Sequence, residues 1–88
     1  MKIKQGFHTK TIDGNLVIVC DKATNPDFNV VISLTETSAL LWDMIMQGNA
    51  TKEKLLNALL ERFDISTVLA LNDIDVFIRT LKENGILE

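Results

Sequence analysis

The fold is decided at residues 30–42, which read VVISLTETSALLW. The first five, Val30–Leu34, form a short, mostly β-branched run that predicts a strand. After Leu34 the spacing of apolar residues changes from about two to about 3.6, which is the helical period. Thr35 is a suitable N-cap residue, so a helix is expected from this point to about Gln47.

The residues before this segment predict two more strands joined by a tight turn. Phe7–Ile12 is rich in threonine and apolar residues, and Leu16–Cys20 is a continuous apolar run. Asp13-Gly14 lies between them, and Asp-Gly between two such runs is a strong hairpin signal. A loop is expected at Asn25-Pro26-Asp27, and residues 2–5 are a candidate for a further short strand.

The residues after it predict two more helices. Thr51 is the next N-cap candidate, and the leucines of residues 52–63 recur on one helical face. A last helix is expected over residues 68–84, with Val76 on its outer side. Three strands followed by three helices predict an α+β domain over residues 1–88. We expect a small three-stranded antiparallel sheet followed by a three-helix bundle, resembling a winged helix.

The chain is apolar for its size. It has 88 residues, 47% of them hydrophobic, and a mean hydropathy of +0.17. A small domain has much surface for its volume, so part of this apolar surface is expected to be exposed and to meet a partner. The first predicted helix is apolar on nearly every side, which is typical of a central helix or one with contacts on two sides.

The sequence favours the cytoplasm. The longest apolar run is Leu16–Cys20, whereas a membrane helix needs about 20 apolar residues. No apolar stretch follows the first basic residues, so no signal peptide and no membrane contact are expected. Cys20 is the only cysteine, which excludes an internal disulfide and is consistent with a reducing compartment.

The inventory of reactive groups does not favour an enzyme. His8 is the only histidine, and with Cys20 it supplies too few ligands for a metal site. Cys20 lies among apolar residues, which is typical of an inert buried thiol. Asp73 and Asp75 are two residues apart on a helix and do not share a face. The four glycines are scattered and form no phosphate-binding loop, so no cofactor and no metal are expected.

Two non-catalytic classes remain. Strands with three helices fit a winged helix that binds DNA, but residues 64–83 carry two basic and four acidic residues, which opposes contact with phosphates. The other class is a peptide- or protein-binding module. Val30–Leu34 has neither proline nor charge to block pairing at a sheet edge. This strand can therefore accept an extended peptide, or it can be covered within the fold or by a second copy. A connecting loop of about eight residues leaves a domain-swapped homodimer open.

Several blocks of sequence, taken in order, resemble one known family. Leu34-Thr35-Glu36-Thr37-Ser38-Ala39 resembles the family's Leu-Asn-Glu-Thr-Ala helix start, with a threonine cap in place of the usual asparagine. The remaining blocks resemble its glycine turn, second helix and Asp-Val-x-x-Phe-Leu-x-x-Leu ending with Gly-Leu: Gly48, Thr51, Leu55, Leu56, Leu59, Phe63, Asp73–Ile78, Leu81 and Gly85–Leu87. The blocks cover about residues 30–88 and resemble the PqqD family, the small proteins of pyrroloquinoline quinone biosynthesis and related recognition elements of ribosomally made peptides.

The resemblance implies a protein without catalytic activity of its own. Family members bind the leader of a ribosomally made precursor peptide and present it to a modifying enzyme, often a radical SAM protein. In related modules the peptide adds as a strand to the third β-strand, in a groove walled by the third helix. The peptide-binding residues that this implies here are Val30, Val31, Ile32, Ser33, Leu34, Asp73, Val76, Phe77 and Arg79. No nucleic acid partner is expected.

Overall fold

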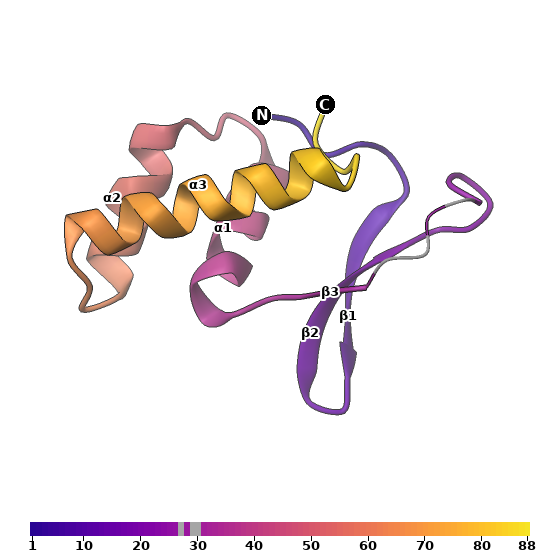
Figure 1. The fold of residues 1–88 in the computed structure, drawn as a ribbon, viewed down its shortest axis with the longest axis horizontal. Helices are drawn as coiled ribbons and strands as arrows, with labels where there is room; N and C mark the ends of the chain where they lie inside the picture. The colour runs from indigo at the N-terminus through magenta and orange to yellow at the C-terminus, as the bar shows by residue number, and fades with distance from the viewer. Residues whose placement is uncertain (27, 29–30) are drawn as a thin grey trace.

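Strands precede helices in the described chain, which is residues 1–26, 28 and 31–88 of a computed structural model (Figure 1). Over those residues the strands are β1 (Phe7–Ile12), β2 (Asn15–Cys20) and β3 (Ile32–Ser33), and the helices are α1 (Glu36–Gln47), α2 (Lys52–Arg62) and α3 (Thr67–Glu83). The strands form an open antiparallel sheet in the order β1-β2-β3. Figure 1 shows the helices grouped at one end of this sheet. The predicted α+β class is confirmed.

The β1-β2 hairpin turns where the Asp-Gly signal predicts. Ile12 lies opposite Asn15, which leaves a two-residue turn. Asp13 and Gly14 have φ angles of 51° and 80°, and positive φ at both positions is the mark of a type I′ turn. This turn fixes the register of the hairpin. The register in turn determines which residues of β2 direct their main-chain N–H and C=O groups toward β1 and which direct them to the opposite side.

β3 is shorter than predicted. The expected strand covers Val30–Leu34, but the strand that forms is Ile32–Ser33, with Ile32 opposite Ile18 of β2. Val30 lies outside the described residues. Val31 is 63% exposed, so little packing against the described residues stabilises a strand at this position. Strand propensity expresses packing against neighbours more than a backbone preference, which is why the apolar run overestimates the strand.

Threonine and serine cap the helices. The Ser38 N–H donates to the Thr35 side chain, and the Thr35 N–H donates to Ser38 Oγ at 2.7 Å, so the predicted cap is a reciprocal capping box. Thr51 caps α2 as predicted. Ser66 caps α3, which therefore begins at Thr67, one residue before the predicted start.

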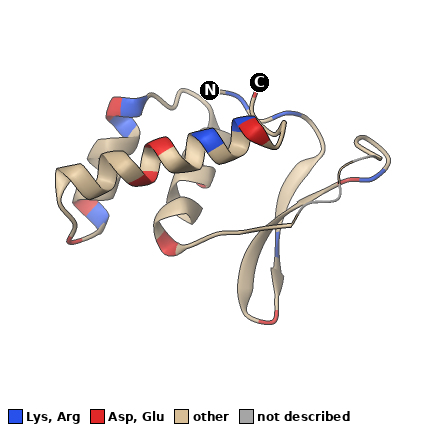
Figure 2. Cartoon of the chain, in the orientation of Figure 1, with Lys and Arg blue, Asp and Glu red and all other residues tan. Residues whose placement is uncertain are grey.

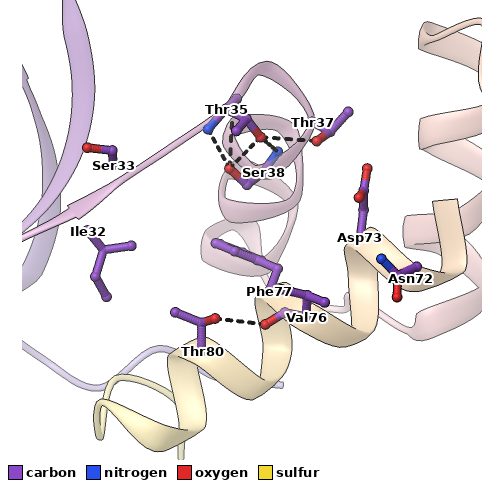
Figure 3. Close-up of a pocket in the computed structure, with 10 residues that line it drawn as sticks. All are labelled: Ile32, Ser33, Thr35, Thr37, Ser38, Asn72, Asp73, Val76, Phe77 and Thr80. Atoms are coloured by element: carbon purple, nitrogen blue, oxygen red, sulfur yellow. Dashed lines mark hydrogen bonds between the residues drawn. The ribbon is translucent and has the colours of Figure 1, made fainter. Parts of the chain in front are cut away.

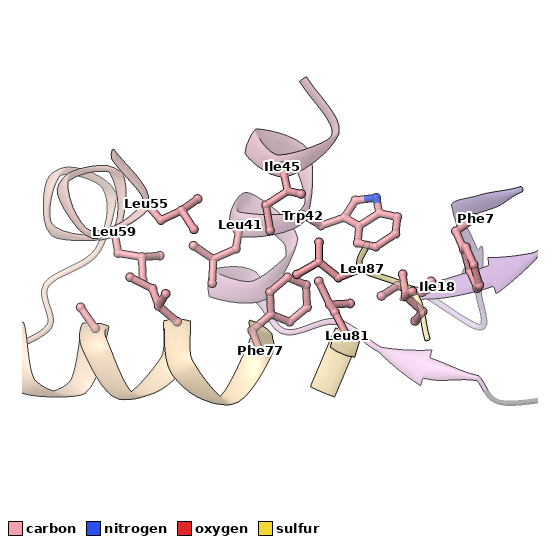
Figure 4. Packing of buried hydrophobic residues seen from close by; sticks show 13 residues of the cluster. Phe7, Ile18, Leu41, Trp42, Ile45, Leu55, Leu59, Phe77, Leu81 and Leu87 are labelled. Carbon is pink, nitrogen blue, oxygen red and sulfur yellow. The ribbon is translucent and has the colours of Figure 1, made fainter. Parts of the chain in front are cut away.

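The core joins the three helices to the sheet (Figure 4). α1 packs against both α2 and α3, as its apolar composition predicts. Its Met46 is 49% exposed. The buried cluster comprises Phe7, Ile18, Leu41, Trp42, Ile45, Leu55, Leu59, Ala70, Ile74, Phe77, Leu81, Ile86 and Leu87.

The two ends of the chain lie side by side near the end of α3 (Figure 1). Ile3 and Leu87 form an isolated antiparallel bridge, and the Lys4 N–H donates to the Ile86 carbonyl oxygen at 2.8 Å. The strand expected over residues 2–5 is thus reduced to this bridge. Among the described helices, none has the length and apolar character needed to span a membrane.

Candidate functional site

The register of the sheet directs the main chain of Ser33 away from β2. Antiparallel partners alternate between pairs that exchange both main-chain hydrogen bonds and pairs that exchange none. The Leu34 N–H donates to the Leu16 carbonyl oxygen at 2.8 Å, and Ile32 lies opposite Ile18, two residues along each strand. Both pairs therefore belong to the bonded class. Ser33 lies between them, so its N–H and C=O face outward at the edge of the described sheet.

A groove opens beside this edge, between β3, the start of α1 and α3 (Figure 3). Its volume is about 270 Å³, just below the roughly 300–1,000 Å³ typical of small-molecule sites. A strand edge that forms one wall suits the side chains of an extended segment better than an enclosed ligand. The lining residues are Ile32, Ser33, Thr35, Thr37, Ser38, Asn72, Asp73, Val76, Phe77 and Thr80.

α3 supplies the opposite wall through one helical face. Asp73, Val76, Phe77 and Thr80 line the groove, and their spacing of three, four and seven residues places them on the same side of a helix. The Phe77 side chain is only 6% exposed and belongs to the core, so it is held in place by packing. The Val76 side chain is 45% exposed, and this is apolar surface that a bound ligand can cover.

The start of α1 forms the polar rim of the groove. Thr35 and Ser38 form the capping box described above, and the hydroxyl oxygens of Thr35 and Thr37 lie 3.1 Å apart. Figure 3 shows these side chains bonded to one another. Their hydrogen bonds within the helix start give the rim a fixed shape.

The groove has little charge. Asp73 is the one charged residue among those that line it. Figure 2 shows no charged residue on β3 or on the chain that leads from it to α1. On α3, Asp73, Asp75 and Glu83 outnumber Arg79 and Lys82 by three to two, so this helix has a net charge of −1.

The structure brings together five of the nine site residues that the sequence predicts. Those five, which line the groove, are Ile32, Ser33, Asp73, Val76 and Phe77. Leu34 turns its N–H inward to β2 and packs on the core. Val31 and Arg79 are exposed and do not line the groove, and Val30 lies outside the described residues.

The groove also contains polar residues that sequence reasoning did not assign to it. They are Thr35, Thr37, Ser38, Asn72 and Thr80. Thr80 has a sequence signal, because it follows Asp73 by seven residues on the same helical face. Thr37 and Ser38 have none, since only the fold brings the start of α1 beside α3.

The groups considered for catalysis lie apart from the groove. His8 is exposed on β1. The Cys20 thiol is half-buried, and Sγ lies 3.9 Å from the Asn25 carbonyl oxygen. Over residues 1–26, 28 and 31–88, no group of three or more His, Cys, Asp or Glu side chains is placed to hold a metal ion.

Comparison with known proteins bears on both family and fold. A family model described as coenzyme PQQ synthesis protein D (PqqD) matches residues 18–87. Two solved structures have a similar fold, each at 18% sequence identity and a TM-score of 0.76. One is TbiB1 in complex with the TbiA(beta) leader peptide; the match covers 100% of this chain and 95% of the TbiB1 chain. The other is lasso peptide synthetase B1 complexed with the leader peptide; the match covers 99% of this chain and 95% of the synthetase chain. No curated protein sequence matches.

Proposed function

The chain belongs to the family of coenzyme PQQ synthesis protein D, and on that premise we propose that it binds the leader of a ribosomally made precursor peptide without catalysing a reaction itself. The observation that carries the proposal is the outward-facing main chain of Ser33 beside a groove walled by α3. The two solved structures of similar fold, both described with a leader peptide, support it.

Binding would proceed by strand addition to β3. The N–H and C=O of Ser33 would exchange hydrogen bonds with the peptide main chain, which would set the register. Alternate peptide side chains would then enter the groove and cover Val76 and Phe77. Each main-chain hydrogen bond contributes only about 0.5–1.5 kcal/mol net, whereas full burial of one large apolar side chain contributes about 1.5–3 kcal/mol. With so short a strand, the groove would therefore supply most of the affinity.

The bound leader would be presented to a peptide-modifying enzyme, such as a radical SAM protein. The peptide would occupy β3 and the groove, which leaves the rest of the surface for the enzyme. Holding substrate and enzyme together raises the effective concentration of the substrate at the active site without any further contact to the residues that react.

The charge on α3 does not suit the alternative of a DNA-binding winged helix. Contact with DNA is made largely through positive side chains that neutralise phosphates. In this chain α3 has a net charge of −1, and the groove beside it carries a carboxylate with no ion-pair partner among the described residues. Cytoplasmic location and a homodimer stay predictions from the sequence.

Titration of the isotopically labelled chain with leader peptides encoded near its gene tests the proposal. We expect backbone amide shifts at Ser33 and along the groove face of α3, from Asp73 to Thr80. The amide of Gly14, at the far end of the hairpin, is the internal control and should not shift.

β1 is the other edge of the described sheet, so strand addition to β1 is the alternative outcome of this test. Shifts confined to β1 would move strand addition to that edge, and the assignment to β3 would be wrong. An absence of shifts with every leader encoded nearby would contradict peptide binding itself.

A further inference from the structure

One carboxylate in the groove has no partner among the residues that the structure describes. Asp73 is half-buried and lines the groove. Within the part of the chain that the structure describes, its side chain makes no ion pair and no hydrogen bond. Lys52 pairs with Asp75 at 2.8 Å, and Arg79 is exposed and does not line the groove.

A peptide that covers the groove would change the surroundings of this carboxylate. Removing a charge from water costs free energy unless a partner compensates it, and the cost rises with burial. The hydroxyl oxygens of Thr35 and Ser38 already accept hydrogen bonds from main-chain N–H groups at the start of α1. Thr37 and Asn72 also line the groove but can offer only neutral donors, so a cation of the peptide would compensate the carboxylate more strongly.

The position of Asp73 sets its distance from the apolar part of the groove. Figure 3 shows Asp73 and Thr37 at one end, Ile32 and Thr80 at the other, and Val76 and Phe77 between them. Along α3, three to four residues at a rise of about 1.5 Å each span roughly 4.5–6 Å. Alternate side chains of an extended peptide are about 6.6 Å apart. One groove-facing residue can thus lie against Val76 and Phe77, and the next against Asp73.

Building on the proposed peptide-binding function, we propose that Asp73 is a specificity-determining residue that selects a lysine or arginine of the bound peptide. The basic residue lies two positions from an apolar residue that covers Val76 and Phe77. The carboxylate accepts hydrogen bonds from the cationic side chain, and such charge-assisted bonds are stronger than neutral ones. The substrate class is therefore a leader with paired basic and apolar residues at alternate positions.

Selection from a displayed library of random short peptides on the full chain gives the first test. We expect the enriched sequences to share a basic residue two positions from an apolar one. The same selection on Asp73→Asn should lose the basic preference, and on Asp73→Lys it should favour aspartate or glutamate at that position. Asp75→Asn is the matched control, since it makes the same change on the same helix outside the groove, and its selection should equal the wild type.

A double-mutant cycle gives the magnitude. Fluorescence anisotropy of an enriched peptide and its Lys→Gln variant would be measured on the wild type and on Asp73→Asn. We expect the peptide change to weaken binding to the wild type roughly three- to tenfold and to have little effect on the variant. Thermal unfolding of Asp73→Asn shows whether the variant folds as the wild type does.

The outcomes separate this inference from the function on which it rests. Equal losses on the wild type and Asp73→Asn, or enriched peptides with acidic or neutral residues at this position, would overturn the role of Asp73 and leave strand addition intact. If no enriched peptide depends on the outward N–H of Ser33, as judged by Ser33→Pro, the proposed function fails and the inference fails with it.

Discussion

Replacement of Ser33 by proline removes one main-chain N–H from the exposed edge of β3. The register directs this N–H away from β2, so the sheet itself loses no hydrogen bond, and edge strands accept proline at such positions. A peptide carbonyl that pairs with Ser33 would be left without a donor. Leaving one polar group unsatisfied costs about 1–3 kcal/mol, which is roughly 5- to 150-fold in the dissociation constant.

The assay is fluorescence anisotropy with a labelled leader peptide, together with urea unfolding of each variant. Ser33→Ala retains the N–H and should bind as the wild type does. Ile32→Pro is the complementary control, because its N–H faces Ile18 and its loss should lower the free energy of unfolding by about 1–3 kcal/mol. If Ser33→Pro binds the peptide with wild-type affinity while remaining folded, strand addition at β3 is refuted.

Four further changes test individual features. Val76→Thr keeps the side-chain shape on a half-exposed site, so it should leave stability nearly unchanged but weaken peptide binding by about 1 kcal/mol, measured by anisotropy. Phe77→Ala should lower the free energy of unfolding by about 3–5 kcal/mol in urea titrations, because its ring is in the core. Gly14→Val should cost about 1–2 kcal/mol in the same titration, because φ is 80° there. Asp75→Ala breaks an ion pair with Lys52 whose side chains are 54% and 50% exposed, and should cost at most about 1 kcal/mol in low salt.

Each of these changes has a result that would contradict its reasoning. A large loss of stability in Val76→Thr would place that side chain in the core, and unchanged binding would remove it from the site. A small effect of Phe77→Ala would mean that the groove wall is not anchored by packing. A neutral Gly14→Val would argue against the type I′ turn, and a loss of several kcal/mol in Asp75→Ala would show that its ion pair is not solvent-screened.

The turns and helix starts could be predicted because single residues determine them. Asp13-Gly14 predicts the hairpin since few other pairs tolerate positive φ at both positions. Thr35 and Thr51 predict helix starts because their side chains satisfy free N–H groups of the first turn. These effects are local, so the fold class and the order of the elements followed from them.

The length of β3 and the composition of the groove depend on distant contacts. Val31 belongs to a β-branched run, but its side chain is largely exposed, and so little packing against the described residues extends the strand. Arg79 lies on α3 near the predicted site, yet its exposed side chain does not line the groove. Thr37 and Asn72 are ordinary helix-surface residues in sequence, and only the packing of α1 against α3 makes them neighbours of one groove.

Amide hydrogen exchange at Ser33, measured with and without a leader peptide, tests the central claim most directly. In the free protein we expect the Ser33 N–H to exchange fast and the Ile32 and Leu34 N–H groups to be protected by β2. Bound peptide should slow exchange at Ser33 by about tenfold or more, because its N–H then donates to the peptide. Unchanged exchange at Ser33 in a saturated complex would contradict strand addition to β3.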